Sequence, residues 1–120
     1  MKILIADDSR VMRQIVIRTL RQAGFEGHDL VEASDGRQAH DTAVAEKPDL
    51  VVSDWNMPEM TGIQVLTALR AAGNQVPFGF VTSECTPEMQ NAATAAGALF
   101  FIIKPFTPER FKEALSTVLK

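Results

Sequence analysis

The sequence contains almost no cysteine, no long apolar run and no excess of basic charge, and each shortage excludes a class of protein. Cys85 is the only cysteine, so the chain can form neither an internal disulfide nor a multi-cysteine zinc site, which suits a reducing compartment. The longest apolar run, residues 98–103, is far shorter than the ~20 residues of a membrane helix. The apolar residues 3–6 are too few for the core of a secretory signal. We therefore expect a cytoplasmic protein without membrane insertion.

Charge and length set two further limits. The chain has 12 basic and 15 acidic residues, a net charge of −3, so a broad surface for nucleic acid or anionic membrane is not expected. Its 120 residues are enough to bury one self-sufficient core, and no linker, repeat or low-complexity segment divides them. We expect a single domain spanning residues 1–120.

Short apolar runs alternate with helical patterns along the whole chain. The runs comprise residues 3–6, 30–31, 50–52, 78–81 and 99–103. Their continuous apolar character is typical of strands that are covered on both faces. Alternation of strands with helices predicts an α/β fold, in the order βαβαβαβαβα, with a parallel sheet and helices on both faces.

The helices are indicated by caps and by apolar stripes. Caps are expected at Asp35, Thr61, Thr86 and Thr107, and proline follows the last two. The helix between Ser9 and Gly24 is expected to bury Met12, Ile15, Val16, Leu20 and Ala23. The last helix is expected to bury Phe111, Ala114, Leu115, Val118 and Leu119.

Chemistry-bearing residues follow the strands, at the edge where ligands bind in folds of this kind. They are Asp7, Asp8, Asp54, Thr82 and Lys104. Each alone suits a cap, a loop, a strand end or a solvated charge. Together they place three carboxylates at one edge, where they repel one another unless a cation is present.

Magnesium is the cation that fits this set best, because it prefers hard oxygen ligands and often joins one or two carboxylates to phosphate oxygens. Mg²⁺ together with Lys104 would balance the three carboxylates. Such a site can accept a phosphoryl group: one carboxylate acts as nucleophile, while the cations and a hydroxyl neutralise the transferring oxygens.

At these residues the sequence resembles the response-regulator receiver domains of two-component signalling, most closely the chemotaxis (CheY-like) type. The resemblance covers the whole chain and rests on residues 5–9 (IADDS), 54–62 (DWNMPEMTG), 81–84 (VTSE) and 104–106 (KPF). It implies a flavodoxin-like (βα)5 fold with strand order 2-1-3-4-5. It also implies a phosphorylation-switched protein that catalyses only its own phosphorylation and dephosphorylation and is not otherwise an enzyme.

The resemblance also assigns roles to individual residues. It implies Asp54 as the phosphoacceptor, with Asp8, Asp54 and the main-chain carbonyl of Asn56 as Mg²⁺ ligands and Asp7 acting mostly through metal-bound water. Thr82 would donate to the phosphoryl group and Lys104 would pair with it. The peptide bond before Pro105 would be cis.

Two loop positions, Asn56 and Glu84, control hydrolysis of the acyl phosphate in the family that the chain resembles. Both are polar and could orient water, so we expect a short-lived phosphorylated state. The alternative is that both are solvated loop residues without a role in hydrolysis.

The phosphorylated protein is expected to pass on its signal by binding another protein, because no effector domain is expected in the chain. In the resembling family, movement of the residue equivalent to Thr82 is coupled to rotation of an aromatic, here Phe101, where many relatives carry tyrosine. The expected partners are a histidine kinase or histidine phosphotransfer domain as donor, and an unknown output protein at the face of the fourth helix, fifth strand and fifth helix.

A docking patch for the donor is expected around Ile17, which falls outside the apolar stripe predicted for the first helix and on its polar side with residues such as Arg13; an ordinary exposed isoleucine is the alternative. His28 and His40 lack partners at metal-ligand spacing and are expected at the surface. Cys85 is expected to be a small, semi-buried residue.

Two other classes of protein share this sheet. A Mg²⁺-dependent phosphohydrolase with an aspartyl nucleophile would carry Asp-x-Asp after the first strand, and 120 residues leave no cap for substrate selection. A flavin-binding electron carrier would need a hydroxyl- and glycine-rich phosphate loop where this chain places acid.

Overall fold

The computed structural model describes residues 1–25, 27–116 and 118. Five strands alternate with five helices in these ranges, in the order expected from the sequence. The strands are β1 (Lys2–Ala6), β2 (Asp29–Ala33), β3 (Leu50–Ser53), β4 (Phe78–Thr82) and β5 (Phe100–Ile103). The helices are α1 (Arg10–Gln22), α2 (Gly36–Glu46), α3 (Gly62–Ala71), α4 (Pro87–Ala95) and α5 (Pro108–Leu115).

All the strands pair in parallel in one sheet of order β2-β1-β3-β4-β5, which confirms the predicted topology. Parallel neighbours require crossover connections, and each connection contains one helix. Their carboxyl ends therefore meet at one edge, and the loops after β1, β3, β4 and β5 converge there.

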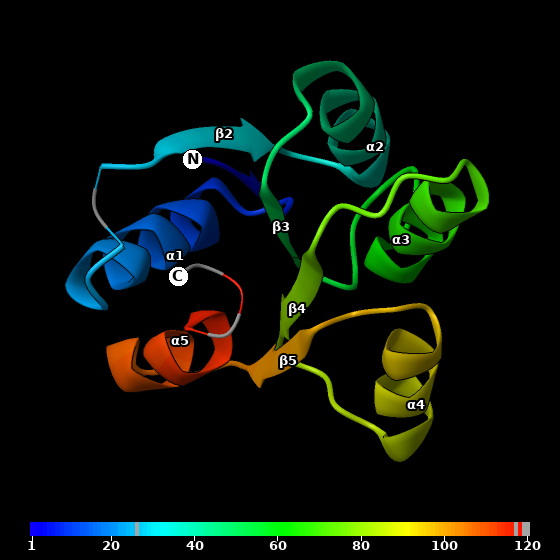
Figure 1. The fold of residues 1–120 in the computed structure, drawn as a ribbon. Coiled ribbons are helices and arrows are strands. Elements are labelled where there is room, and N and C mark those ends of the chain that lie inside the picture. The colour runs from blue at the N-terminus through cyan, green and yellow to red at the C-terminus, as the bar shows by residue number, and fades with distance from the viewer. Residues whose placement is uncertain (26, 117, 119–120) are drawn as a thin grey trace.

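Two layers of helices cover the sheet, with α1 and α5 on one face and α2, α3 and α4 on the other (Figure 1). Successive residues of a strand point to opposite faces. Ile3 and Ile5 accordingly belong to the core beneath α1 and α5, whereas Leu4 and Ala6 belong to the core on the other side. Burial on both faces explains why the strands read as continuous apolar runs.

The predicted caps are confirmed. The side chains of Asp35, Thr61, Thr86 and Thr107 each accept a hydrogen bond from the main-chain N–H three residues further on, and Ser9 caps α1 in the same way. Of the stripe expected in the last helix, Phe111 and Leu115 are buried, and Leu119 lies outside the described residues. No helix among the residues described is long and apolar enough to cross a membrane.

The predicted burial pattern of α1 is wrong at two positions. Ile17 is only 8% exposed and belongs to the core beneath α1 and α5, whereas Ile15 is 38% exposed. The buried residues are Val16, Ile17, Thr19 and Leu20, which span roughly 160° at about 100° per residue. The arc is wide because α1 packs against α5 as well as the sheet. Ile17 therefore forms no docking patch.

The expectation for Cys85 is also wrong, because its side chain is exposed. It lies in the loop between β4 and α4, beyond the last buried residue of the strand, Thr82. Its Sγ accepts a hydrogen bond from Gln90 Nε2 at 2.7 Å. His28 and His40 are both partly exposed, which agrees with the predicted surface positions.

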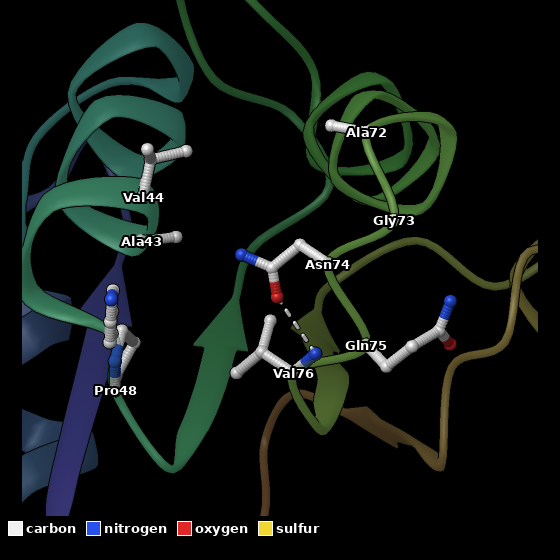
Figure 2. Close-up of a pocket in the computed structure, with 9 residues that line it drawn as sticks. Ala43, Val44, Pro48, Ala72, Gly73, Asn74, Gln75 and Val76 are labelled. Carbon is white, nitrogen blue, oxygen red and sulfur yellow. Dashed lines mark hydrogen bonds between the residues drawn. The ribbon is translucent and has the colours of Figure 1, made fainter.

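A hollow of about 510 Å³ lies at the opposite end of the sheet, where β3 and β4 begin (Figure 2). Most of its lining is small or neutral, including Ala43, Val44 and Pro48. In it, Asn74 Oδ1 accepts a hydrogen bond from the main-chain N–H of Val76 at 3.0 Å. Lys47 is the only charged residue among those that line it. This hollow brings together no set of groups capable of acid, base or metal chemistry.

Candidate functional site

Asp7 follows β1 and is the most buried carboxylate at the carboxyl edge, with 4% of its surface exposed. Its main-chain N–H continues the sheet by donating to the carbonyl oxygen of Ala33 at 3.1 Å. One carboxylate oxygen accepts from the main-chain N–H of Ser9 at 2.9 Å, and the other lies 3.0 Å from Lys104 Nζ. A carboxylate this buried requires such partners, and both of its oxygens have one.

Asp54 follows β3 and lies beside Asp7. Its main-chain N–H donates to Ala6 in β1 at 2.8 Å, which extends the pairing of the two strands into the loops. Its Oδ1 accepts from the main-chain N–H of Trp55 at 2.7 Å, and its Oδ2 lies 3.4 Å from Lys104 Nζ. Lys104 thus bridges Asp7 and Asp54, and only 14% of its side chain is exposed.

The chain beyond β5 carries Lys104 to this position. The main-chain N–H of Lys104 donates to Thr82 at 2.9 Å, which continues the β4–β5 pairing by one residue. The following peptide bond, Lys104–Pro105, is cis, as the resemblance implied. Two carboxylates from separate loops share the ammonium group of Lys104.

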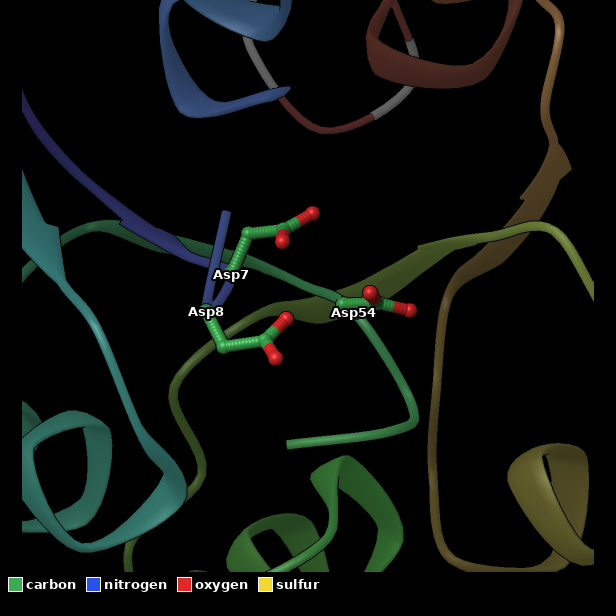
Figure 3. Close-up of side chains that lie close together, drawn as sticks. All are labelled: Asp7, Asp8 and Asp54. Carbon is green, nitrogen blue, oxygen red and sulfur yellow. The ribbon is translucent and has the colours of Figure 1, made fainter. Parts of the chain in front are cut away.

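Asp8 completes a cluster of carboxylates that differ in burial. One ligand atom from each of Asp7, Asp8 and Asp54 lies within 4.8 Å of the others, and the three side chains point into the same space (Figure 3). Asp8 is exposed, and no residue in the described ranges donates a hydrogen bond to its carboxylate. Its negative charge is therefore available to a cation from solvent.

The donor set fits Mg²⁺. Protein oxygens bind this ion at about 2.0–2.1 Å, so opposite ligands are roughly 4.2 Å apart. One ligand atom from each carboxylate lies within 4.8 Å of the others, and the unpaired Asp8 side chain is free to rotate toward an ion bound among them. The three negative charges exceed the one positive charge of Lys104 by two, which is the charge of the ion.

Asn56 and Glu84 meet at the mouth of this site. Asn56 Nδ2 donates to Glu84 Oε1 at 3.2 Å, across loops that follow β3 and β4. A hollow of about 300 Å³ beside them is lined by Asp8, Asn56, Met57, Pro58 and Thr61. The two predicted loop residues are therefore paired, and Asn56 borders the open space next to Asp8.

The loop after β3 is held in place by a close approach at Gly62. The main-chain N–H of Gly62 donates to Trp55 at 2.7 Å, and a Cβ atom here would collide with the Asp54 carbonyl oxygen and the ring of Phe80. Within the loop, Glu59 adopts a left-handed conformation with φ of 70°. Only glycine allows α3 to begin this close to Asp54.

Thr82 and Phe101 lie in the neighbouring strands β4 and β5. Thr82 is fully buried, and its hydroxyl accepts from the main-chain N–H of Glu84 at 3.5 Å. The ring of Phe101 is half-buried and lies 6.3 Å from that of Trp55 and 6.0 Å from that of Phe80, between centroids. The aromatic contacts thus run from the residue after Asp54 to the outer strand.

Sequence reasoning missed one residue that touches the site. Arg13 was expected on the exposed side of α1, but one of its terminal nitrogens donates to the main-chain carbonyl of Asp7 at 2.7 Å. The signal was its spacing: Arg13, Val16, Ile17 and Leu20 follow the i, i+3, i+4, i+7 pattern of one helix face.

Comparison with known proteins identifies the family. The response regulator receiver domain matches residues 3–116 of the chain. The chain belongs to this family. Receiver domains take part in two-component signalling and generally bind Mg²⁺ at an acidic pocket, and this chain has an acidic cluster at the carboxyl edge of its sheet.

Similar receivers are chemotaxis proteins. CheY1 of Helicobacter pylori and the CheY homolog of Campylobacter jejuni are each 38% identical over 99% of this chain, which covers 97% and 92% of their lengths. The structure of CheY4 of Vibrio cholerae is similar with a TM-score of 0.84 and 38% identity, covering 98% of both chains. The receiver domain of a response regulator, NarL, from Mycobacterium tuberculosis has a TM-score of 0.86 at 28% identity, covering 97% of this chain and 93% of that one. This receiver is thus CheY-like in sequence and fold.

Proposed function

We propose that this receiver accepts a phosphoryl group on Asp54 in the presence of Mg²⁺, from a phosphohistidine donor or a small acyl phosphate. The observation that carries the proposal is the shared ammonium group: Lys104 lies 3.0 Å from Asp7 and 3.4 Å from Asp54, beside the unpaired carboxylate of Asp8. One buried cation between two carboxylates, with a third left open, suits a site that must bind a metal ion and then a phosphoryl group.

The residues divide the chemistry among them. A carboxylate oxygen of Asp54 attacks the donor's phosphorus, forming an O–P bond while the bond from phosphorus to the leaving nitrogen or oxygen breaks and its electron pair stays with the leaving group. Lys104 and the Thr82 hydroxyl would pair with the phosphoryl oxygens. Asp8, Asp54 and the Asn56 carbonyl would hold Mg²⁺, which supplies positive charge against the phosphoryl oxygens. Asp7, with both oxygens already paired, would act mostly through metal-bound water.

Hydrolysis returns the protein to its resting state. The oxygen of a water attacks phosphorus, the O–P bond to Asp54 breaks, and inorganic phosphate leaves while the carboxylate is restored. Asn56 lines the open space beside Asp8 and donates a hydrogen bond to Glu84, and the two residues would orient this water. The phosphorylated state is then short-lived.

Output would be a change in binding at the face of α4, β5 and α5. Attraction of Thr82 toward the phosphoryl group would leave space for Phe101, which already contacts Trp55 and Phe80. Phe101 also lines a hollow of about 290 Å³ with Ile103, Pro105 and Phe106. Rotation of its ring would alter this hollow for an output protein, and as phenylalanine it would act through volume alone.

The donor would dock beside the site on α1, although not at Ile17. Val11 and Ile15 are the exposed apolar residues of this helix, 71% and 38% exposed, and α1 begins three residues after Asp7. A histidine kinase or a histidine phosphotransfer domain would present its phosphohistidine there. Because the donor kinase would draw its phosphoryl group from ATP, the protein would act in the cytoplasm, and its CheY relatives support a role in a chemotaxis pathway.

The test is Mg²⁺-dependent labelling by a small acyl phosphate, measured as the mass of the intact protein. The natural chain should gain one phosphoryl group with Mg²⁺ and none with a chelator, and Asp54→Asn should gain none. A natural chain that stays unlabelled would overturn the proposal. Steady turnover of phosphomonoesters would instead indicate a phosphohydrolase.

A further inference from the structure

Arg13 lies on the buried side of α1, where a positive charge is costly unless it has partners. Only 12% of its side chain is exposed. At about 100° per residue it falls within the arc occupied by Val16, Ile17 and Leu20. The other basic residues of this helix, Arg10, Arg18 and Arg21, are exposed.

The guanidinium group of Arg13 connects three elements. Its Nε donates to Glu32 Oε1 in β2 at 2.8 Å, and its Nη1 donates to the main-chain carbonyl oxygen of Asp7 at 2.7 Å. The planar group can make both hydrogen bonds at once because its donors are held in a fixed fork. It therefore ties α1 and β2 to the turn that carries Asp7 and Asp8.

The carbonyl that Arg13 holds belongs to the peptide between Asp7 and Asp8. A peptide is planar, so fixing its oxygen also fixes the direction in which the chain enters Asp8. The Asp7 side chain has its own anchors in Ser9 and Lys104. Asp8 has no side-chain anchor within the described ranges, and its position depends on the main chain.

We infer that Arg13 is a positioning residue, which orients Asp8 for Mg²⁺ by holding the carbonyl of Asp7. The inference rests on the proposed function only in requiring that Mg²⁺ binds at this site. Mutation of a residue that orients a metal ligand through a hydrogen bond commonly lowers metal affinity by about 10–100-fold.

Electrostatics and positioning predict opposite effects of removing Arg13. Arg13→Ala deletes a positive charge near the site and leaves Glu32 without its ion-pair partner. Coulomb attraction alone would then tighten Mg²⁺ binding. Loss of the hydrogen bond to Asp7 would weaken it, so the sign of the change distinguishes the two.

The experiment is a Mg²⁺ titration of the full chain, followed by the fluorescence of Trp55, the only tryptophan, which hydrogen-bonds to Asp54. Arg13→Ala should raise the dissociation constant for Mg²⁺ roughly ten-fold. Arg13→Lys keeps the charge but loses the planar set of donors, so its dissociation constant for Mg²⁺ should lie between those of Arg13→Ala and the natural chain. Arg18→Ala is the matched control, because it removes an exposed arginine from the same helix, and it should bind as the natural chain does.

Urea unfolding of each variant separates misfolding from a local effect. If Arg13→Ala does not fold, Arg13→Gln is measured in its place. Its uncharged amide keeps one donor group, and its Mg²⁺ affinity should also be lower than that of the natural chain. Affinity equal to or tighter than that of the natural chain in the folded variant overturns the inference and leaves the proposed function intact. Absence of Mg²⁺ binding by the natural chain overturns both.

Discussion

At the scale of single residues, the site depends on three aspartates in unequal surroundings. Asp7 is buried and paired on both oxygens, Asp54 is held by Trp55 and Lys104, and Asp8 is exposed and unpaired. Chemically identical side chains thereby become available for different tasks. In the proposed function Asp8 would attract a cation and Asp54 would react, while Asp7 contacts Lys104 at 3.0 Å.

The pairing of Asn56 with Glu84 predicts that both residues affect dephosphorylation. Asn56→Ala and Glu84→Ala should each lengthen the life of the phosphorylated state, because each removes a polar group that orients the attacking water. Loss of one hydrogen bond, about 1 kcal/mol, corresponds to roughly a five-fold slower rate. The measurement is the decay of phosphorylated protein after the donor is removed.

Ser83→Ala is the control for this loop, since Ser83 is exposed and lies between Thr82 and Glu84. It should leave the decay rate unchanged. Decay at the natural rate in both the Asn56 and Glu84 variants would reduce these residues to solvated loop positions.

At the scale of elements, α1 carries two faces with different tasks. Its buried face combines Val16, Ile17 and Leu20 with Arg13, and so joins the core to the acidic cluster. Its exposed face presents Val11 and Ile15 beside that site. One helix therefore contacts the acidic cluster through its buried face and carries, on its exposed face, the surface at which we propose that the donor docks.

Charge substitutions on the two faces should have separate effects. Ile17→Asp should lower the free energy of unfolding by more than about 3 kcal/mol, because it buries an unpaired carboxylate. Ile15→Asp should change it by less than about 1 kcal/mol, because its side chain is already partly in water. Urea unfolding of both variants measures the difference.

The same Ile15→Asp variant should slow phosphotransfer from a cognate phosphohistidine donor while leaving labelling by a small acyl phosphate intact. Val44→Asp on α2 is the control, since Val44 is also an exposed apolar residue, 51% exposed, on another helix. Equal losses with both donors would indicate damage to the fold rather than to a docking surface.

Most elements could be predicted from sequence because their signals are local. Caps such as Asp35 and Thr61 lie within three residues of the groups that they bind, and buried strands show continuous apolar runs. The burial of Ile17 and Arg13 was predicted wrongly because it depends on α5 and β2, which pack against α1 from elsewhere in the chain. Cys85 was placed wrongly because residue type alone does not show where a loop leaves the core.

The convergence of the site residues could also be predicted, since parallel strands bring their carboxyl ends together. Their pairing could not. These contacts depend on loop conformations that are set by long-range packing, such as the close approach of Gly62 to Asp54. They are the ion pairs of Lys104 with Asp7 and Asp54, and the hydrogen bond between Asn56 and Glu84.

At the scale of the whole molecule, the charge balance is explained by the site. Without Asp7, Asp8 and Asp54, the acidic residues of the chain would equal its 12 basic residues. The net charge of −3 thus has the magnitude of one local cluster. Concentrated negative charge of this kind opposes folding unless a cation neutralises it.

Mg²⁺ should therefore stabilise the folded protein as a whole. At a concentration 100 times the dissociation constant, a ligand that binds only the folded state adds about 2.7 kcal/mol. Asp8→Asn should raise the melting temperature without Mg²⁺, by relieving repulsion, and should lose most of the gain on adding Mg²⁺. Thermal unfolding with and without the ion measures both effects.

Asp41→Asn provides the matched control, because it removes an exposed carboxylate from α2, where Asp41 contacts His40. Its response to Mg²⁺ should equal that of the natural chain. A natural chain whose melting temperature ignores Mg²⁺, or an Asp8 variant with an undiminished response, would contradict the assignment of the ion to this cluster.

In the proposed function, Asp54 itself carries the phosphoryl group. The direct measurement is to treat the chain with Mg²⁺ and a small acyl phosphate, reduce the aspartyl phosphate with borohydride to homoserine, and locate the altered residue by peptide mass spectrometry. We predict homoserine at position 54 and unmodified aspartate at positions 7 and 8. Homoserine at another position, or none in the natural chain, would contradict the account.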